Sequence, residues 1–291
     1  MTGVVGVIGV GNMGAAMARN LLAQGYTVHA HDIDPAQMQL MRDAGAVTHD
    51  SPSALAKSAN LIIIAVVHAL QVDQVMDGEE GLGPKLTPDH TLMLCPTISP
   101  QDVERLTLHI HSLGASVIDA PMSGGPARAQ AGTMSLMVAC EEAVYSRHAA
   151  VLQVLSNQIF RISTKPGDGA RTKLVNNLLA GINLVGAAEV LVLAERMGLS
   201  AQTTLAVMAQ SSGQSWIGSD RMTRALADHL TPLAHMSLLT KDTRLACEAA
   251  LDAKVKVPLG QQASDIFAKA CEAGWRDMDD AALLQFLRQL N

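Results

Sequence analysis

The 291-residue chain has few aromatic residues and little charge. It contains two Trp, two Tyr and three Phe, and 16% of its residues are charged against 48% that are hydrophobic. A chain of this length can bury a large core, which must therefore be built from Leu, Val, Ala and Met. The formal net charge of −6 and the absence of a long basic run argue against a general nucleic-acid binder.

Signals of secretion, membrane insertion and metal binding are also missing. No positively charged segment precedes the first apolar stretch, so we expect no signal peptide. The apolar run LIIIAVV at 61–67 is too short to span a bilayer, and the longer LLAGINLVGAAEVLVLA contains Asn183 and Glu189, which favours a helix buried within the protein. The four cysteines form no C-x-x-C pair and indicate reduced thiols in a cytoplasmic protein. Ten histidines occur without metal-ligand spacing, so we expect no metal site.

The stretch VIGVGNMG at 7–14 places three glycines between an apolar run and a helical pattern. In such a G-x-G-x-x-G turn the first glycine, Gly9, permits the turn, and the second, Gly11, lets the backbone approach a pyrophosphate. The third, Gly14, allows the helix to pack close to the strand, and the N–H groups of the helix N-terminus favour an anion. The stretch therefore predicts that a dinucleotide contacts Gly9, Gly11, Asn12, Met13 and Gly14.

The residues around this turn support the same interpretation. The apolar run 4–10 is typical of a strand buried on both faces, the spacing over 13–22 predicts a helix, and a second strand over 27–31 ends at Asp32. An acid there accepts hydrogen bonds from ribose hydroxyls and repels a 2′-phosphate, and the following IDPAQ supplies no arginine. We therefore expect NAD as the cofactor, with NADP disfavoured. The alternative is a glycine-rich turn in some other βαβ fold.

In the first half of the sequence, short apolar runs alternate with helical stretches. The alternation predicts an α/β fold with a Rossmann-type, parallel, doubly wound sheet and the cofactor across the carboxyl ends of its strands. Further strands are expected at 61–67, 91–95, 116–120 and 134–140, and helices near 35–44, 51–57 and 100–113.

The second half changes character at about Gly167, after which only helical periodicity is found. We predict a dinucleotide-binding domain over 1–163 and an all-α substrate and oligomerisation domain over 164–291, joined by a long helix beside a cleft. The expected helices run from about Gly169 to Met197 and near 201–210, 218–228, 240–253, 258–273 and 279–289.

Two loops that follow expected strands carry candidate binding groups. In DAPMSGGPARAQAGT at 119–133, the segment Ser123–Gly125 is rich in backbone N–H donors and can hold a carboxylate. An ordinary loop rich in proline and glycine is the alternative. In CPTISP at 95–100, Thr97 or Ser99 offers a hydroxyl where a nicotinamide or ribose would rest.

The strongest catalytic candidate lies in PGDGARTKLVNNLLAG at 166–181. Here Lys173, Asn177 and Gly181 recur every fourth residue and share one face of the long helix. A lysine partly buried there has its pKa lowered toward the range useful for proton transfer, whereas a solvated surface lysine is the alternative. No histidine occurs in these motifs, and Asp119 and Asp168 lie at a strand end and in a loop, where structural roles are expected. In LLTKDTRLA at 238–246, Lys241 and Asp242 form a surface ion pair or a further part of the site.

Together, GVGNMGAAMARNLL, DAPMSGG, GDGARTKLVNN and KDTRLA resemble four ordered motifs of the β-hydroxyacid dehydrogenase family. This family includes 3-hydroxyisobutyrate dehydrogenase, tartronate semialdehyde reductase and L-threonate dehydrogenase, and it is related to 6-phosphogluconate dehydrogenase. The resemblance covers almost the whole chain. It implies a Rossmann-type domain followed by an all-α domain, and reversible hydride transfer between a nicotinamide cofactor and the hydroxyl-bearing carbon of a short hydroxy acid.

The resemblance also implies roles for individual residues. Lys173 corresponds to the general acid/base and Asn177 to its helper on the same helix. The carboxylate-binding loop corresponds to Ser123, Gly124 and Gly125.

On the cofactor side, Thr97 corresponds to the residue beside the nicotinamide, and Lys241 to the lysine that closes the far side of the site. Val66 and Val67 are also expected at the cofactor, although Val67 stands where family members often carry proline. VVHALQVDQV and SSGQSWIGSDRM look more like the threonate branch, which favours a small polyhydroxy acid. The branch's Asn-Arg-Met element is here Asp220–Met222, so the resemblance does not identify the exact hydroxy acid.

Two other functions remain possible on these residues. An imine reductase shares the fold, but such enzymes usually replace the catalytic lysine that is present here as Lys173. A non-catalytic nicotinamide-binding module would be expected to lose that lysine or to gain basic tails. The expected partners are a small hydroxy acid or semialdehyde and further copies of the chain in a homodimer or homotetramer, with neither nucleic acid nor membrane.

Overall fold

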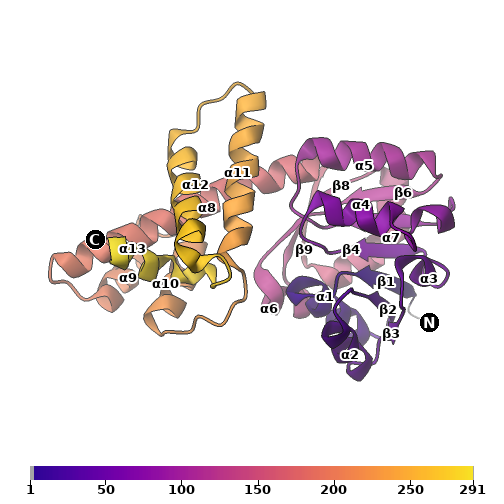
Figure 1. The fold of residues 1–291 in the computed structure, drawn as a ribbon, viewed down its shortest axis with the longest axis horizontal. Helices are drawn as coiled ribbons and strands as arrows, with labels where there is room; N and C mark the ends of the chain where they lie inside the picture. Colours follow the sequence, from indigo (N-terminus) through magenta and orange to yellow (C-terminus); the bar gives the residue numbers. More distant parts are fainter. Residues whose placement is uncertain (1–2, 291) are drawn as a thin grey trace. The chain divides into compact units, whose positions relative to one another are not determined.

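A computed structural model of the chain describes residues 3–290 and contains an α/β part followed by an all-helical part (Figure 1). Its backbone divides into two compact units, Met1–Lys173 and Leu174–Asn291. The division falls inside helix α8 (Asp168–Arg196), which therefore belongs to both units. The predicted fold class is confirmed.

All named strands among residues 3–290 belong to one sheet, in the order β3-β2-β1-β4-β5-β6-β8-β7, with β9 beside β8. Neighbouring strands from β1 to β6 run parallel, and the strand order reverses between β1 and β4, where doubly wound sheets bind their ligands. The bounds are β1 Val4–Ile8, β2 Thr27–His31, β3 Val47–Thr48, β4 Leu61–Ile64, β5 Thr91–Leu94, β6 Ser116–Asp119, β7 Met122–Ser123, β8 Ser135–Ala139 and β9 Gln158–Ser163.

The far end of the sheet differs from the expected all-parallel pattern. β8, predicted as 134–140, runs antiparallel to β6, and β9 was not predicted. The chain between β6 and β8 forms only β7 and the short helix α6 (Gly125–Gln130), which is too little for the crossover helix that a parallel return requires. β8 therefore returns in the opposite direction, and its neighbour β9 pairs parallel to it.

Helices cover both faces of this sheet. α1 (Asn12–Ala23), α2 (Pro35–Asp43) and α7 (Glu142–Leu155) pack on one face, and α3 (Pro52–Ala56), α4 (Ala69–Asp77) and α5 (Pro100–Ser112) pack on the other. Proline occupies the first turn of α2, α3 and α5, each after a side-chain cap, as helix starts favour. α4 and α7 were not predicted, although their buried residues recur at helical spacing.

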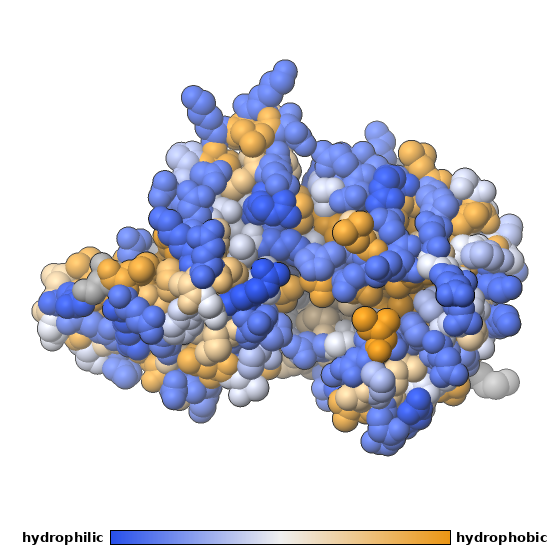
Figure 2. Space-filling view, viewed as in Figure 1, coloured by the Kyte–Doolittle hydropathy of each residue, from blue (hydrophilic) through white to orange (hydrophobic). Residues whose placement is uncertain are grey.

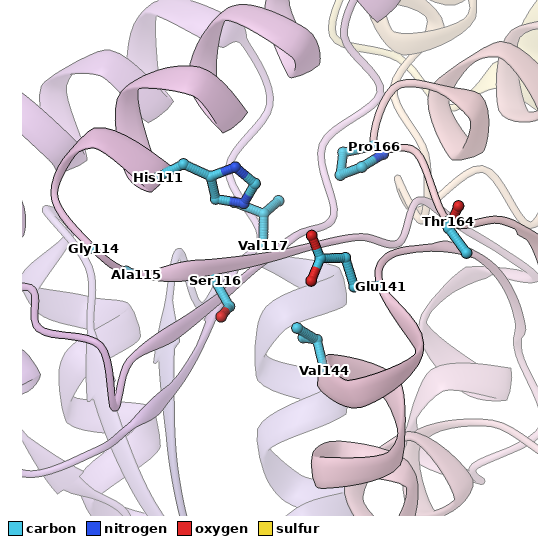
Figure 3. Close-up of a pocket in the computed structure, with 9 residues that line it drawn as sticks. All are labelled: His111, Gly114, Ala115, Ser116, Val117, Glu141, Val144, Thr164 and Pro166. Atoms are coloured by element: carbon cyan, nitrogen blue, oxygen red, sulfur yellow. The ribbon is translucent and has the colours of Figure 1, made fainter.

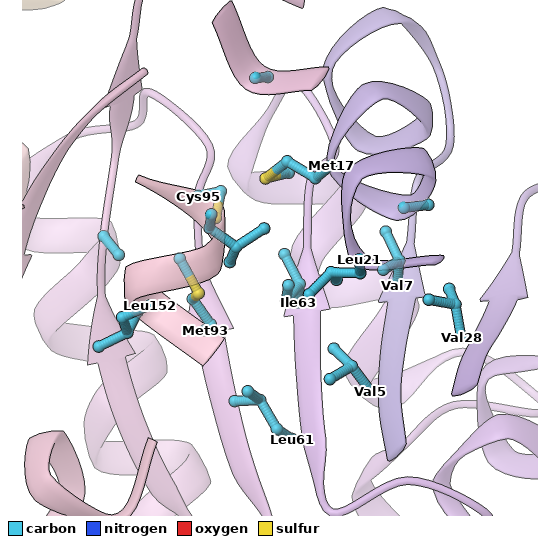
Figure 4. Close-up of a cluster of buried hydrophobic side chains, with 14 of the residues drawn as sticks. Val5, Val7, Met17, Leu21, Val28, Leu61, Ile63, Met93, Cys95 and Leu152 are labelled. Carbon is cyan, nitrogen blue, oxygen red and sulfur yellow. The ribbon is translucent and has the colours of Figure 1, made fainter. Parts of the chain in front are cut away.

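The strands are apolar because they are buried from both sides. Along β4, Leu61 and Ile63 contribute to one core cluster, whereas Ile62 and Ile64 contribute to the other. Figure 4 shows part of the first cluster, in which side chains from β1, β4 and β5 meet Met17 of α1 and other helical residues. A strand with no solvated face has no place for polar residues, which explains runs such as LIII.

The second unit is helical, as predicted, and no strand is named after Ser163 in the part of the chain that the structure describes. Its core surrounds the fully buried Phe267. Past α8, the helices are α9 Ala201–Gln210, α10 Trp216–Leu226, α11 Met236–Asp252, α12 Pro258–Ala270 and α13 Leu283–Leu290, with short turns at Cys271–Trp275 and Asp280–Ala282.

One side of α8 in the second unit is apolar and exposed. Val190, Leu193 and Met197 follow one another at helical spacing around its C-terminal end, and their exposed fractions are 42%, 57% and 68%. Figure 2 shows hydrophobic residues at the surface over this end of α8 and α9. By length and composition alone α8 could span a bilayer, but half of its most apolar window is buried, as in the core helices of many proteins without a membrane segment.

Candidate functional site

The glycine turn after β1 has the geometry that its spacing predicts. Gly9 has φ of +85°, and its N–H donates to the carbonyl of His31 over 2.9 Å. A Cβ on Gly14 would lie 1.8 Å from the carbonyl oxygen of Gly9, so only glycine lets α1 pack this close. A Cβ on Gly11 would meet nothing within 4 Å, and no side chain caps the N-terminus of α1. Open space therefore lies where a pyrophosphate would approach the helix dipole.

Asp32 lies beside this turn, at the carboxyl end of β2. One carboxylate oxygen accepts from the Val10 N–H over 2.7 Å, and the other accepts from the Asp34 N–H over 2.9 Å. These bonds hold the carboxylate at the edge where the glycine turn lies. Val66 and Thr97 follow the neighbouring strands β4 and β5 at the same edge of the sheet, because β1, β4 and β5 are parallel.

The predicted substrate loop joins β7 to α6. Gly124 and Gly125 have φ of +129° and +76°, a backbone conformation that favours glycine at both positions. Ser123 ends β7 and is half-buried. The loop therefore combines backbone donors and a hydroxyl without bulky side chains.

The structure brings Lys173 to this loop. Its side chain is buried, with an exposed fraction of 7%, and its Nζ donates to the carbonyl of Met122 over 2.5 Å. Met122 precedes Ser123, so the amine lies next to the segment predicted to hold the substrate carboxylate. The expectation that Lys173 is buried, and is not a solvated surface lysine, agrees with its placement.

Asp119, which the sequence suggested as structural, is buried at the end of β6 with an exposed fraction of 1%. Its Oδ2 accepts from the N–H of Gly167 over 2.7 Å and from the N–H of Ala170 over 3.1 Å. Burial raises the pKa of this carboxyl to about 6, against the opposing effect of these backbone hydrogen bonds. The carboxylate thus holds the first turn of α8, which carries Lys173.

In the second unit, Asn177 and Asp242 form a buried pair between α8 and α11. Asn177 Nδ2 donates to Asp242 Oδ2 over 2.6 Å, and Asn176 Nδ2 donates to Asn177 Oδ1 over 3.0 Å. Lys241 Nζ lies 3.2 Å from the other oxygen of Asp242, and both side chains of this ion pair are mostly buried. The Lys241–Asp242 pair is therefore not the solvated pair that the sequence left open.

The helices that carry this pair are in close contact. A Cβ on Gly181 would lie 2.6 Å from Cγ2 of Thr243, so glycine lets α8 and α11 approach each other. The sequence singled out Lys241 as a site residue and indicated Asp242 only as its ion-pair partner or a further part of the site; the place of Asp242 directly after Lys241 was the available signal.

A cavity of about 290 Å³ lies elsewhere in the first unit. His111 and Glu141 point into it beside Ser116, which begins β6 (Figure 3). This is the amino end of β6, whereas the glycine turn follows the carboxyl end of β1, and none of the predicted site residues lines the cavity. Within residues 3–290, no group of three or more His, Cys, Asp or Glu side chains is placed to hold a metal ion.

Two family descriptions together match most of this chain. Residues 4–163 match the NAD binding domain of 6-phosphogluconate dehydrogenase, and residues 167–287 match the family described as NAD-binding of NADP-dependent 3-hydroxyisobutyrate dehydrogenase. The chain belongs to the β-hydroxyacid dehydrogenase family. The predicted family is thereby confirmed, and the first unit carries its dinucleotide-binding domain.

Individual relatives agree with this membership. L-threonate dehydrogenase from Cupriavidus necator is 33% identical over 97% of this chain and 95% of its own length. Mitochondrial 3-hydroxyisobutyrate dehydrogenase from Mus musculus is 29% identical over 98% of this chain and 87% of its own length. The crystal structure of 3-hydroxyisobutyrate dehydrogenase from Salmonella typhimurium superposes with a TM-score of 0.91 at 31% identity, covering 97% of this chain and 99% of that one.

Proposed function

We propose that this protein is an oxidoreductase that transfers a hydride between NAD and the hydroxyl-bearing carbon of a three- or four-carbon hydroxy acid. One observation carries the proposal: the buried amine of Lys173 lies on the carbonyl of Met122, directly before Ser123–Gly125. It occurs in a chain whose family consists of dinucleotide-dependent dehydrogenases. Oxidation of a hydroxy acid requires a group that accepts the hydroxyl proton and a loop that binds the carboxylate, and these two segments can supply both.

The first unit fits a nicotinamide dinucleotide. The open space at Gly11 and the uncapped start of α1 suit the pyrophosphate, and the carboxylate of Asp32 suits the ribose hydroxyls. When bound, NAD supplies the acceptor for the hydride. We assign cofactor contacts to Gly9, Gly11, Asn12, Met13, Gly14, Asp32, Val66, Val67, Thr97 and Lys241.

The chain's own groups then bind the carboxylate of the substrate and transfer the proton of its hydroxyl group. The segment Ser123–Gly125 binds the carboxylate through backbone N–H groups and the serine hydroxyl. The amine of Lys173 accepts the hydroxyl proton as the carbon loses its hydride, and returns it in the reverse direction. Asn177, one helical turn further along α8, orients the reacting group.

We infer that the substrate is an unphosphorylated polyhydroxy acid. Several relatives at 29–33% identity are L-threonate dehydrogenases, and no cluster of arginines occurs in the four motifs to pair with a phosphate. Imine reductases share the fold at about 20% identity, which supports no common activity, and Lys173 argues against that chemistry here.

We also propose a domain organisation, an assembly and a location for the protein. We propose a dinucleotide-binding domain over 1–163 and an all-helical substrate and oligomerisation domain over 164–291. The exposed apolar side of α8 supports a homodimer or homotetramer, because patches of this kind mark interaction surfaces. The unpaired cysteines suit a cytoplasmic protein. We propose neither a nucleic-acid partner, which the net charge of −6 disfavours, nor a membrane partner.

A substrate panel tests the proposed function. The purified protein is assayed with threonate, glycerate, 3-hydroxyisobutyrate, 2-(hydroxymethyl)glutarate, a phosphorylated hydroxy acid and a cyclic imine, each with NAD(H) and NADP(H). We expect the highest kcat/KM for an unphosphorylated three- or four-carbon acid with NAD. Turnover of the imine alone, or cofactor binding without turnover of any compound, contradicts the proposal and supports one of the two alternatives.

A further inference from the structure

Asp119 links the two segments that meet at Lys173. It ends β6, three residues before Met122, whose carbonyl accepts the hydrogen bond from the Lys173 amine. Its carboxylate accepts the N–H groups of Gly167 and Ala170, at the start of the helix on which Lys173 lies. One side chain therefore ties the helix that carries the amine to the loop that receives it.

The two glycines of the GDGA stretch, Gly167 and Gly169, allow the backbone to approach this carboxylate closely. Gly167 has φ of +103°, a conformation that favours glycine, and its N–H donates to Asp119 just before α8 begins. A Cβ on Gly169 would lie 2.9 Å from the Asp119 carboxylate and 2.7 Å from the carbonyl oxygen of Met137 on β8. The first turn of α8 thus packs tightly between β6 and β8, which pair at Asp119 and Ala139.

The distance along the helix makes the effect on Lys173 direct. Ala170, held by Asp119, stands one helical turn before Lys173, and a regular helix transmits a shift of its first turn to the next. A displacement of about 1 Å in a reacting group can cost about a hundredfold in rate. We propose that Asp119 is a positioning residue for proton transfer: its carboxylate sets the place of the Lys173 amine relative to Ser123–Gly125. This inference rests on the proposed function of Lys173.

Three variants separate positioning from general stability. Asp119→Ala removes the carboxylate, and Asp119→Asn keeps one neutral oxygen as an acceptor. Asp280→Asn is the matched control, because Asp280 is equally buried, has a pKa raised to about 6 by burial, and lies in the second unit in an ion pair with Arg221. The readouts are kcat, the KM of the hydroxy acid, the Kd of NAD and the solvent deuterium isotope effect on kcat.

For Asp119→Ala we expect kcat to fall by about a hundredfold, with a smaller change in KM and an unchanged Kd for NAD. The solvent isotope effect should rise, because a misplaced amine makes proton transfer slower than the other steps. Asp119→Asn should recover about a tenth or more of the wild-type kcat through its remaining acceptor, and Asp280→Asn should leave the isotope effect unchanged. A kcat of Asp119→Ala close to wild type, or a loss matched by loss of folded protein at an unchanged isotope effect, overturns the proposal.

Amide hydrogen exchange keeps this test separate from that of the proposed function. Exchange over residues 166–173 is measured on the full chain with no substrate present. Faster exchange there in Asp119→Ala, but not in Asp280→Asn, supports the positioning role even if no hydroxy acid is turned over. Unchanged exchange overturns it whatever the substrate panel shows.

Discussion

Asn177 on α8 and Asp242 on α11 share a buried hydrogen bond of 2.6 Å from Nδ2 to Oδ2. The bond fixes the orientation of the Asn177 amide, because a carboxylate can only accept hydrogen bonds and its partner must therefore be the NH₂ group of the amide. The amide oxygen of Asn177 is thereby directed away from Asp242, toward the side where Asn176 donates to it. In the first unit, Asp119 acts on the Lys173 segment in a comparable way through backbone hydrogen bonds.

The first prediction concerns this pair. Asp242→Ala leaves the Asn177 amide free to rotate and should lower kcat by about tenfold to a hundredfold, the range expected for one hydrogen bond to a charged group. Asp242→Asn should be milder if its amide oxygen takes over the acceptor position. Steady-state kinetics on both variants, with thermal unfolding as a control for stability, provide the measurement. Equal activity of Asp242→Ala and wild type would exclude a role for Asp242 in orienting Asn177.

The sequence predicted what depends on local spacing and local conformation. Gly9, Gly11 and Gly14 were assigned three different roles from their spacing, and the φ of Gly9, the open space at Gly11 and the tight packing at Gly14 agree with them. The apolar strands were visible for the same reason, because burial on both faces excludes polar residues. Contacts between distant segments could not be predicted in this way. Nothing near Asp119 in the sequence indicates that its carboxylate accepts hydrogen bonds from the N–H groups of Gly167 and Ala170.

The sequence also did not predict the less buried strand β9 or the direction of β8. β9, QIFRIS, lies at the side of the sheet, and none of its residues is fully buried, so it lacks the continuous apolar run of the central strands. The direction of β8 depends on how much chain is available for a crossover, and apolar periodicity carries no information on strand direction. Spacing thus predicted the binding turn, whereas tertiary hydrogen bonding decided which carboxylates support the site.

The second prediction concerns Lys173. Lys173→Ala should lower kcat by about 10²–10⁴-fold, the usual contribution of a general acid/base, and leave the Kd of NAD nearly unchanged. Lys173→Arg should restore little, because a guanidinium does not release its proton near neutral pH. Steady-state turnover and NAD titration measure both effects. If Lys173→Ala kept more than about a tenth of wild-type kcat, against that expected loss, another group would have to be the base.

The third prediction concerns the cofactor. We expect kcat/KM to favour NAD over NADP, because the 2′-phosphate of NADP would meet the Asp32 carboxylate. Asp32→Asn should narrow the preference, while Asp43→Asn, an exposed acid at the end of α2, should leave it unchanged. One solved relative, 27% identical with a TM-score of 0.91, is a complex with NADP+, so the comparison must include both cofactors. A clear preference of the wild type for NADP would falsify the assignment of Asp32.

The fourth prediction concerns assembly. Light scattering at micromolar protein concentration should give the mass of a dimer or tetramer. A second copy of the chain would bury the exposed apolar side chains of Val190, Leu193 and Met197. Leu193→Asp should shift the mass toward the monomer. Leu108→Asp is the matched control, since Leu108 on α5 is exposed by 72% but lies in the first unit. A monomeric wild type, or equal effects of the two substitutions, contradicts assembly through α8.

The last prediction concerns acid stability. His148 on α7 is buried and pairs through Nε2 with Thr91 Oγ1 over 2.9 Å, and burial lowers its pKa from 6.5 to about 4. A folded-state pKa below the unfolded value means that the folded protein binds fewer protons, so stability falls as the pH drops from 6.5 toward 4. The shift corresponds to a loss of roughly 3 kcal/mol at most.

Variants isolate this contribution from other groups that titrate in the same range. Asp119 and Asp280 have raised pKa values near 6 and act in the opposite sense, since their folded-state carboxyls bind protons first as the pH falls. Urea unfolding at pH 7 and pH 4.5 should therefore show a smaller acid loss in His148→Gln than in wild type. His229→Gln, at an exposed position, should lose as much as wild type. Parallel losses in all three proteins would show that acid lability arises elsewhere than at His148.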